Sequence, residues 1–479
     1  MENLDPVLFR ILETEENSRH LVALRDLEAG ELIFSEHPVA VGPGDSQGSC
    51  IVCSRDTQAV CSRCWWTLCQ RCVHSDIHQE ECRLLSSCTV KGPELGLPTR
   101  HVLSLRCILL KKNLRIWEKL QGLCDHGLQS LDLSPDILNQ DPGLRDLVSF
   151  IRDDCGLNYS IEDISSVYLA ATSSCIIARS EGISLHGVYL QGGLLTHSCI
   201  QNTRIIIKGD QPKMFVYASV PIKKGEKITY CRLPEVVPIG TLERRRLLRE
   251  SFLDCHCKRC CDPTECSSYT SSIYCQRCEG VCIPLNPLNQ DCTWKCLSCQ
   301  ETVDGRFVST LLLSIREDIK TFQGSRSQRY RTFREQNKRI LHPNHYLHTA
   351  ERAKFFLQFS VEESVEDTLL KISAGKDMLE LVDVLDPGLS IFRESLLVNL
   401  GTNLQLLLSD EIVRRQSSDT NTENLADTQV YAGFRDALFC FKEARKAAEL
   451  EGCKSAMTSI DENISILEEM RQYFESITH

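Results

Sequence analysis

The sequence lacks several features that would place it in a particular class of protein. Its 479 residues contain no uninterrupted apolar run of the ~18–20 residues that a membrane helix needs. Residues 1–16 carry acids where a signal peptide would carry bases. The 54 Lys and Arg residues are fewer than the 65 Asp and Glu residues, and the net charge of −11 has the wrong sign for a protein whose main partner is nucleic acid. We therefore expect an intracellular protein, in the nucleus and/or the cytoplasm, that contacts neither a membrane nor nucleic acid directly.

A clear internal repeat is also missing, although a helical-repeat architecture of the TPR kind does not require one. Hydrophobic residues make up 42% of the chain and charged residues 25%, which is the composition of folded globular proteins and argues against wholesale disorder. The length exceeds that of one ordinary hydrophobic core. We expect about two to four packed units.

Cysteine, by contrast, is abundant, with 27 residues. An intracellular chain does not use so many cysteines as a disulfide framework, so metal binding is the favoured interpretation. Eight of them lie between Cys50 and Cys88, and eleven lie between Cys255 and Cys299. The sequence therefore predicts two zinc-rich regions within otherwise ordinary sequence.

The first region contains four pairs of potential ligands, and a two-residue turn can bring both ligands of a pair to one metal ion. Four thiolate or imidazole ligands close a tetrahedral structural zinc site, so the eight ligands predict two zinc ions. We favour His78 over His74, which is the alternative, because the nine residues between Cys64 and His74 are fewer than the about twelve of a DNA-reading finger. The eight ligands are Cys50, Cys53, Cys61, Cys64, Cys69, Cys72, His78 and Cys82.

The second region predicts two more zinc sites. Cys255, Cys257 and Cys260 supply three thiolates, and Cys199 is our candidate for the fourth. A zinc-ribbon pattern then follows in two complete pairs, Cys275 with Cys278 and Cys296 with Cys299. We interpret the remaining cysteines of this region as packed or exposed thiols; they are Cys261, Cys266, Cys282 and Cys292.

Periodicity predicts strands before and after a helical insert. Short apolar runs in residues 21–40, broken at Gly30, favour a β-hairpin, and residues 106–150 have helical spacing. Strand patterns return at residues 203–207, 214–220 and 227–230, and nearly everything beyond Gly305 has helical spacing, including Ala437, Phe441 and Ala444.

Two clusters, one of arginines and one of histidines, do not predict a ligand-binding site. We expect Arg244, Arg245, Arg246 and Arg249 to form one solvated helix face in this acidic chain. His342, His345 and His348 have no paired cysteines nearby, so we expect helix-start and packing roles for them.

Several motifs resemble the SMYD family, in which a MYND zinc finger splits a SET domain. The chain has a MYND-like module, the segment THSCIQN at residues 196–202, GEKITY at 225–230 and CHCKRC at 255–260. The segments GTLERRRLL at 240–248, CDPTE at 261–265, HPNHYL at 342–347 and LDPG at 385–388 resemble the insect branch of this family. In that family the cysteine corresponding to Cys199 completes the site of the CxCxxC trio.

The resemblance implies an α+β fold with a β-rich SET core, an inserted zinc finger, a post-SET zinc region and a TPR-like helical domain. The implied domains are the N-terminal part of SET (1–49), the MYND finger (50–82), a helical insert (83–154), the C-terminal part of SET (155–254), a post-SET region with a second zinc site of four cysteines (255–304) and a helical C-terminal domain (305–479).

Family members transfer a methyl group from S-adenosylmethionine to a protein lysine, which requires deprotonating an amine of reference pKa about 10.4 and aligning it for displacement. The resemblance assigns Tyr230 as the catalytic tyrosine. It assigns Arg19, Thr196 and His197 to the cofactor site.

This chain departs from the family at several cofactor positions. Each lost hydrogen bond costs about 0.5–1.5 kcal/mol and a lost aromatic contact a similar amount, so four such departures would remove about 3–6 kcal/mol, or roughly 10²–10⁴ in affinity, although these contributions need not add. An asparagine expected near residues 173–175 is absent. The other departures are His20 for a glycine, Thr196 for an asparagine, Gln201 for a proline, Ser251 for a tyrosine and Leu253 for a phenylalanine.

Two functional hypotheses follow. In the first, which we favour, the chain is a zinc-stabilised scaffold linked to transcription or chromatin, with weak or no methyl transfer. It would be a monomer that binds corepressor-like or histone-tail-like protein partners through the MYND surface and the helical domain. In the alternative, it is an active S-adenosylmethionine-dependent protein-lysine N-methyltransferase that acts on a histone or another protein.

Overall fold

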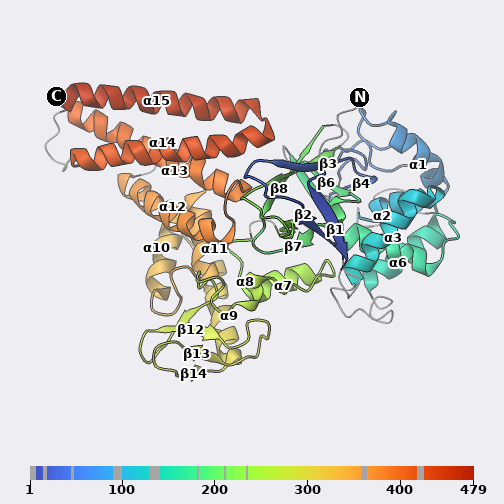
Figure 1. The fold of residues 1–479 in the computed structure, drawn as a ribbon, viewed down its shortest axis with the longest axis horizontal. Helices are drawn as coiled ribbons and strands as arrows, with labels where there is room; N and C mark the ends of the chain where they lie inside the picture. The colour runs from blue at the N-terminus through green and yellow to red at the C-terminus, as the bar shows by residue number, and fades with distance from the viewer. Residues whose placement is uncertain are drawn as a thin grey trace. The chain divides into compact units, whose positions relative to one another are not determined.

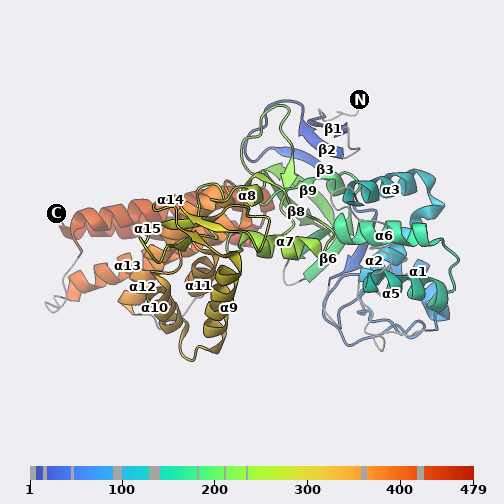
Figure 2. The ribbon, with the colours of Figure 1, turned by 90° about the horizontal axis from the view of Figure 1, so that it is seen from below.

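The computed structural model describes residues 7–13, 19–44, 48–89, 100–128, 141–180, 183–209, 212–233, 236–357, 364–417 and 425–478 (Figures 1 and 2). The chain forms two compact units. Unit 1 comprises Met1–His197, Ile205–Arg232 and Leu247–Cys255, and unit 2 comprises Ser198–Arg204, Leu233–Arg246 and His256–His479. Among the described residues, no helix has the length and apolar character that crossing a membrane requires.

Unit 1 is built on small β-sheets. Two three-stranded sheets have the orders β3-β9-β8 and β4-β6-β5, and two pairs are β1-β2 and β10-β7. The strands are β1 (Phe9–Glu13), β2 (Arg19–Ala23), β3 (Leu32–Glu36), β4 (Ala40–Pro43), β5 (Ile176–Ser180), β6 (Ile183–Val188), β7 (Thr196–His197), β8 (Thr203–Lys208, whose first two residues belong to unit 2), β9 (Lys213–Ala218) and β10 (Thr229–Tyr230).

The strands predicted in residues 21–40 exist, but the hairpin predicted between them is wrong. β2 pairs antiparallel with β1, and β3 pairs antiparallel with β9, so the two strands belong to different sheets. Gly30 does make the predicted turn, with φ of 87°. Its amide donates to the carbonyl of Ala218, which directs the chain toward β9 rather than back along β2.

The predicted helical insert covers one part of the unit 1 core. Within it, Asp141 caps the helix Pro142–Ser149 by accepting from Leu144 N, and Ser160 caps the helix Ile161–Ser173, which follows the insert, by accepting from Asp163 N. Leu103 and Phe150 are fully buried in this core. The helices of unit 1 are α1 (Asp76–Ser87), α2 (Arg100–Leu109), η2 (Leu110–Lys112), α3 (Leu114–Leu128), α5 (Pro142–Ser149), η3 (Phe150–Asp154), α6 (Ile161–Ser173) and η4 (Gly192–Leu194).

Unit 2 combines a small four-stranded sheet with a long helical region. The predicted core positions Ala437, Phe441 and Ala444 are fully buried, and helices α13, α14 and α15 lie side by side (Figure 1). The elements are α7 (Thr241–Arg249, whose last three residues belong to unit 1), α8 (Lys258–Cys261), β11 (Ile273–Tyr274), β12 (Val281–Pro284), β13 (Trp294–Cys296), β14 (Thr302–Val303), α9 (Gly305–Thr321), α10 (Arg326–Asn337), α11 (Tyr346–Phe356), α12 (Val365–Leu385), α13 (Ile391–Ser417), α14 (Asp427–Glu451) and α15 (Lys454–Thr478).

The prediction that the arginines of α7 form a solvated face is wrong at Arg244 and Arg245. Arg244 is fully buried and pairs with the Glu265 carboxylate at 2.7 Å. Arg259, also fully buried, pairs with the same carboxylate at 3.0 Å. Arg245 is buried too, and donates to the Leu288 carbonyl at 2.5 Å. Two buried guanidiniums around one buried carboxylate hold α7 and α8 together inside unit 2.

The three histidines near α11 have the packing roles that we predicted. His345 is the N-cap of α11, and its Nδ1 accepts a hydrogen bond from Leu347 N at 3.2 Å. Burial lowers the pKa of His342 and of His348 to about 4, so both rings are neutral.

Candidate functional site

The structure brings the eight ligands of the first cysteine region together in two groups. Within each group the ligand atoms lie within 4.8 Å of one another. Cys53 Sγ and Cys69 Sγ are 3.7 Å apart in the first group, and Cys61 Sγ and Cys82 Sγ are 3.7 Å apart in the second. His78, rather than the alternative His74, lies in the second group. The groups are Cys50, Cys53, Cys69 and Cys72, and Cys61, Cys64, His78 and Cys82.

The other two quartets also match the sequence predictions. In one, Cys199 Sγ lies 3.6 Å from Cys260 Sγ, and its members are Cys199, Cys255, Cys257 and Cys260. In the other, formed by Cys275, Cys278, Cys296 and Cys299, the sulfurs of Cys275 and Cys299 are 3.7 Å apart and those of Cys278 and Cys296 are 3.6 Å apart. Cys261, Cys266, Cys282 and Cys292 belong to none of the four groups.

Four of the C-x2-C pairs share one backbone conformation, which explains how each pair aims two sulfurs at one point. The residue after the second cysteine has positive φ: Ser54 (56°), Trp65 (64°), Glu279 (58°) and Gln300 (62°). Its amide donates to the carbonyl of the first cysteine, at 2.8 Å for Ser54 and 2.9 Å for Trp65 and Glu279. The left-handed residue thus closes each turn behind the two thiols.

Helix α1 supplies the remaining two ligands of the second group. The Ser75 side chain caps this helix by accepting from His78 N at 3.3 Å, and His78 and Cys82 then lie four residues apart on one helix face. Glu81, on the same helix, forms a bidentate pair with Arg106 at 2.8 and 2.6 Å. Arg106 also donates to the Val41 carbonyl of β4 at 2.6 Å. Buried charges therefore fasten the zinc-finger helix to α2 and to a strand of unit 1.

The donor sets fit zinc. A tetrahedral ion with Zn–S bonds of about 2.3 Å requires sulfurs about 3.8 Å apart, close to the 3.6–3.7 Å found in all four groups. These distances are far from the about 2.05 Å of a disulfide. Amide donors stabilise the thiolate form: the N–H of Cys299 lowers the pKa of Cys296 to about 6, although burial opposes this. Four protein ligands close each site, so zinc would have a structural role and no open position for catalysis.

Three residues assigned by the resemblance to the active site lie together in unit 1. Strands β7 and β10 pair in parallel, which places Thr196 beside Thr229 and His197 beside Tyr230. The His197 Nδ1 accepts from the Arg232 amide at 3.2 Å, and the Arg232 guanidinium donates to the Cys175 carbonyl at 3.2 Å. Tyr230 is half-buried. No pattern in the sequence points to this role of Arg232, because neither of its partners is near it in the chain.

Two of the departures from the family contact each other. His20 on β2 is 8% exposed, and its Nδ1 lies 3.1 Å from Thr196 Oγ1 on β7, within hydrogen-bond distance. Burial and the nearby Lys227 lower the pKa of His20, so its ring is neutral. The ring therefore stands where the family has a glycine, and its partner stands where the family has an asparagine.

The side chain of Arg19, the third predicted cofactor residue, contacts the helical insert. Its guanidinium donates to the Gly122 carbonyl of α3, in the helical insert. A Cβ at position 122 would meet only the flexible end of the Arg19 side chain, so a larger residue there would displace the guanidinium rather than the backbone. The side chains of Arg19, His20 and Thr196 thus all contact other residues of unit 1.

Two features were not predicted from the sequence: the packing of Phe252 and a hydrogen bond from Gln201. Phe252, between the departures Ser251 and Leu253, has φ of 54° and packs edge-on against Tyr168, with ring centroids 5.9 Å apart. The resemblance did not point to Phe252, because the family pattern places the aromatic residue one position later, at Leu253. Gln201, where the family has a proline, donates to the Asp386 carboxylate at 3.1 Å, between α12 and α13.

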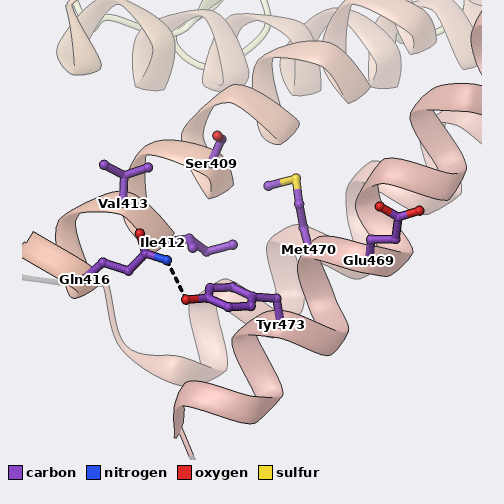
Figure 3. A pocket seen from close by; sticks show the side chains of 7 residues that line it. All are labelled: Ser409, Ile412, Val413, Gln416, Glu469, Met470 and Tyr473. Atoms are coloured by element: carbon purple, nitrogen blue, oxygen red, sulfur yellow. Dashed lines mark hydrogen bonds between the residues drawn. The ribbon is translucent and has the colours of Figure 1, made fainter.

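A groove of about 310 Å³ lies between α13 and α15 in the helical region (Figure 3). Ile412 and Val413 line it from α13, and Met470 and Tyr473 line it from α15. Val413 is 57% exposed and Tyr473 is 43% exposed. These residues are not predictable from the sequence, because helical spacing alone does not show which apolar face stays uncovered.

Comparisons with known proteins agree with this architecture. The family model described as "SET domain" matches residues 18–231. The chain is 26% identical over 325 residues to "SET domain-containing protein SmydA-8, isoform B" of Drosophila melanogaster, covering 61% of this chain and 66% of the relative, slightly less than two thirds of its length. It is 32% identical over 134 residues to "Protein-lysine N-methyltransferase SMYD4" of Mus musculus, covering 26% of this chain and 16% of that relative.

Among solved structures, the chain is similar to one titled "Crystal structure of the SET domain of LSMT bound to Lysine and AdoHcy". The identity is 12%, the match covers 97% of this chain and 88% of that chain, and the TM-score is 0.32. A similarity of this size says nothing about ligands of the present chain. The SET-domain match, the SMYD relatives and the four zinc-type quartets together support a SET-domain protein of the SMYD family, of the insect type.

Proposed function

We propose that this member of a lysine-methyltransferase family is a zinc-stabilised scaffold, linked to transcription or chromatin, with weak or no methyl transfer. The observation that carries the proposal is the contact between His20 and Thr196, 3.1 Å apart. Two substituted cofactor positions bond to each other rather than presenting polar groups to a ligand. All sixteen zinc-type ligands, in contrast, are present and gathered.

The energetic cost of binding the cofactor supports the same conclusion. A ligand at this position would have to displace a buried imidazole ring and separate it from its hydrogen-bond partner. Leaving a buried polar group without a partner costs about 1–3 kcal/mol, or roughly 5- to 150-fold in affinity.

Lysine methyl transfer is the second candidate function. It is favoured by the parallel pairing of β7 with β10, which sets the assigned catalytic Tyr230 beside His197. The relative in Mus musculus is itself named a protein-lysine N-methyltransferase. In this case Tyr230 would orient the lysine amine, and rearranged residues would have to replace the lost cofactor contacts.

A reversion experiment separates the two candidates. His20→Gly combined with Thr196→Asn removes the ring and supplies an amide, so we expect S-adenosylmethionine to bind at least tenfold more tightly than to the parent. Binding would be measured by calorimetry, with Cys266→Ser as a matched control outside all four quartets. Unchanged affinity in the double variant, or a parent that already binds at micromolar concentration, would contradict the proposal.

The scaffold would contact protein partners through two surfaces. On the zinc finger, Trp65 (53% exposed) and Val60 (43% exposed) present apolar side chains to solvent. In the helical region, the α13–α15 groove has Glu469 on its rim and the exposed Glu462 two turns earlier on α15. An apolar floor beside acidic side chains favours an amphipathic partner helix with basic residues. We also propose that the protein is a monomer and that it is located in the nucleus and/or the cytoplasm.

A further inference from the structure

Two cysteines outside the four quartets approach each other more closely than any ligand pair given above. Cys88 Sγ lies 3.0 Å from Cys155 Sγ, although 67 positions separate the two residues in the sequence. Sulfurs in the four quartets are 3.6–3.7 Å apart, so this pair is closer by at least 0.6 Å. Both side chains are buried, at 2% and 7% exposure. Neither belongs to any of the four groups.

The surrounding backbone holds the two thiols in register. Cys88 is the C-cap of α1, and Cys155 is the C-cap of η3. The next residue on one side, Thr89, donates its amide to the Asp154 carbonyl at 3.1 Å, and its hydroxyl donates to the Asp154 carboxylate at 2.6 Å. The thiols therefore face each other because two hydrogen bonds join the chain segments that carry them.

We propose that Cys88 and Cys155 form an oxidisable dithiol site, which a hydroperoxide converts to a disulfide that joins the end of helix α1 to the end of η3. A disulfide requires an S–S distance of about 2.05 Å, so the sulfurs must approach by about 1 Å. Gly156, which follows Cys155 directly, has φ of 66°.

The reaction balances with hydrogen peroxide as the only co-reactant. One thiolate attacks a peroxide oxygen and becomes a sulfenic acid as the O–O bond breaks and water leaves. The second thiol then attacks that sulfur and releases a second water. Two thiols lose two electrons and two protons in total, and one peroxide gains them. The contact with Cys155 lowers the pKa of Cys88, which makes Cys88 the better first nucleophile.

Peptide mapping of the zinc-loaded full chain tests this site directly. After limited hydrogen peroxide and acid quenching with N-ethylmaleimide, trypsin should release Cys88 in the peptide 84–91, joined to Cys155 in the peptide 153–179. Fragment ions distinguish Cys155 from Cys175, which lies in the same peptide. A chromogenic zinc chelator in a parallel sample should show that the cross-link forms before zinc is released.

A matched pair of variants completes the test. Oxidation should raise the melting temperature of the parent and of Cys107→Ser, a control at another buried cysteine, by several degrees, because the cross-link constrains the unfolded chain. Cys155→Ser should show no such rise. Recovery of Cys88 and Cys155 as separate maleimide adducts after zinc has been lost, or joined to other cysteines instead, would overturn the proposal. Neither result depends on whether the chain transfers methyl groups.

Discussion

Cys199 shows at the scale of one residue how a distant ligand completes a metal site. Its sulfur lies 3.6 Å from that of Cys260 and belongs to the quartet of the CxCxxC trio. We expect Cys199→Ser to lose about one zinc ion per chain by elemental analysis, because three thiolates do not close a tetrahedral site.

The matched control is Cys266→Ser, which lies close in sequence to the same trio but outside the quartet and should lose no zinc. Equal zinc content in Cys199→Ser and the parent would show that another residue completes the trio.

The contact between His20 and Thr196 lies beyond what the sequence alone predicts. The resemblance identified both residues as departures from the family, but it did not show that the two side chains contact each other. The two positions are 176 residues apart in the chain, and only the folded sheets bring their side chains within 3.1 Å. Pattern reasoning does predict the zinc quartets, because the short spacing of each pair fixes its local geometry.

At the scale of the element, periodicity predicted strands and helices better than their pairing. The runs that form β2 and β3 are visible in the sequence, but their partners, β1 and β9, depend on contacts across the chain. The same holds for α7, where consecutive arginines look solvated until Glu265 is placed beside Arg244 and Arg259.

Strand β8 offers a test of such a long-range contact within unit 2. The Arg204 side chain is 2% exposed and pairs with Glu394 of α13 at 2.8 Å and with Glu451 of α14 at 2.6 Å. We expect Arg204→Ala to lower the free energy of unfolding by about 2–4 kcal/mol in urea denaturation, because it leaves Glu394 largely buried without its cation.

Arg435→Ala serves as the control, because that side chain is 77% exposed and its loss should cost less than about 0.5 kcal/mol. Comparable effects of the two substitutions would show that the buried pair does not stabilise unit 2.

For the whole molecule, four closed quartets predict about four zinc ions per chain. Inductively coupled plasma analysis of the purified protein measures this number directly. Removal of zinc by a strong chelator should unfold the finger and the ribbon-like sheet, since their small cores depend on the metal. Two or fewer ions per chain would contradict the ligand assignment.

The central claim is that the zinc framework of this SET-domain protein persists while its cofactor site does not. Calorimetric titration of the parent protein with S-adenosylmethionine tests it most directly. We predict no saturable heat below about 1 mM, and at ~100 μM ligand a stabilisation of only about 0.06 kcal/mol. A dissociation constant in the low micromolar range, with methyl transfer that is lost in Tyr230→Phe, would contradict the scaffold account and establish the enzyme.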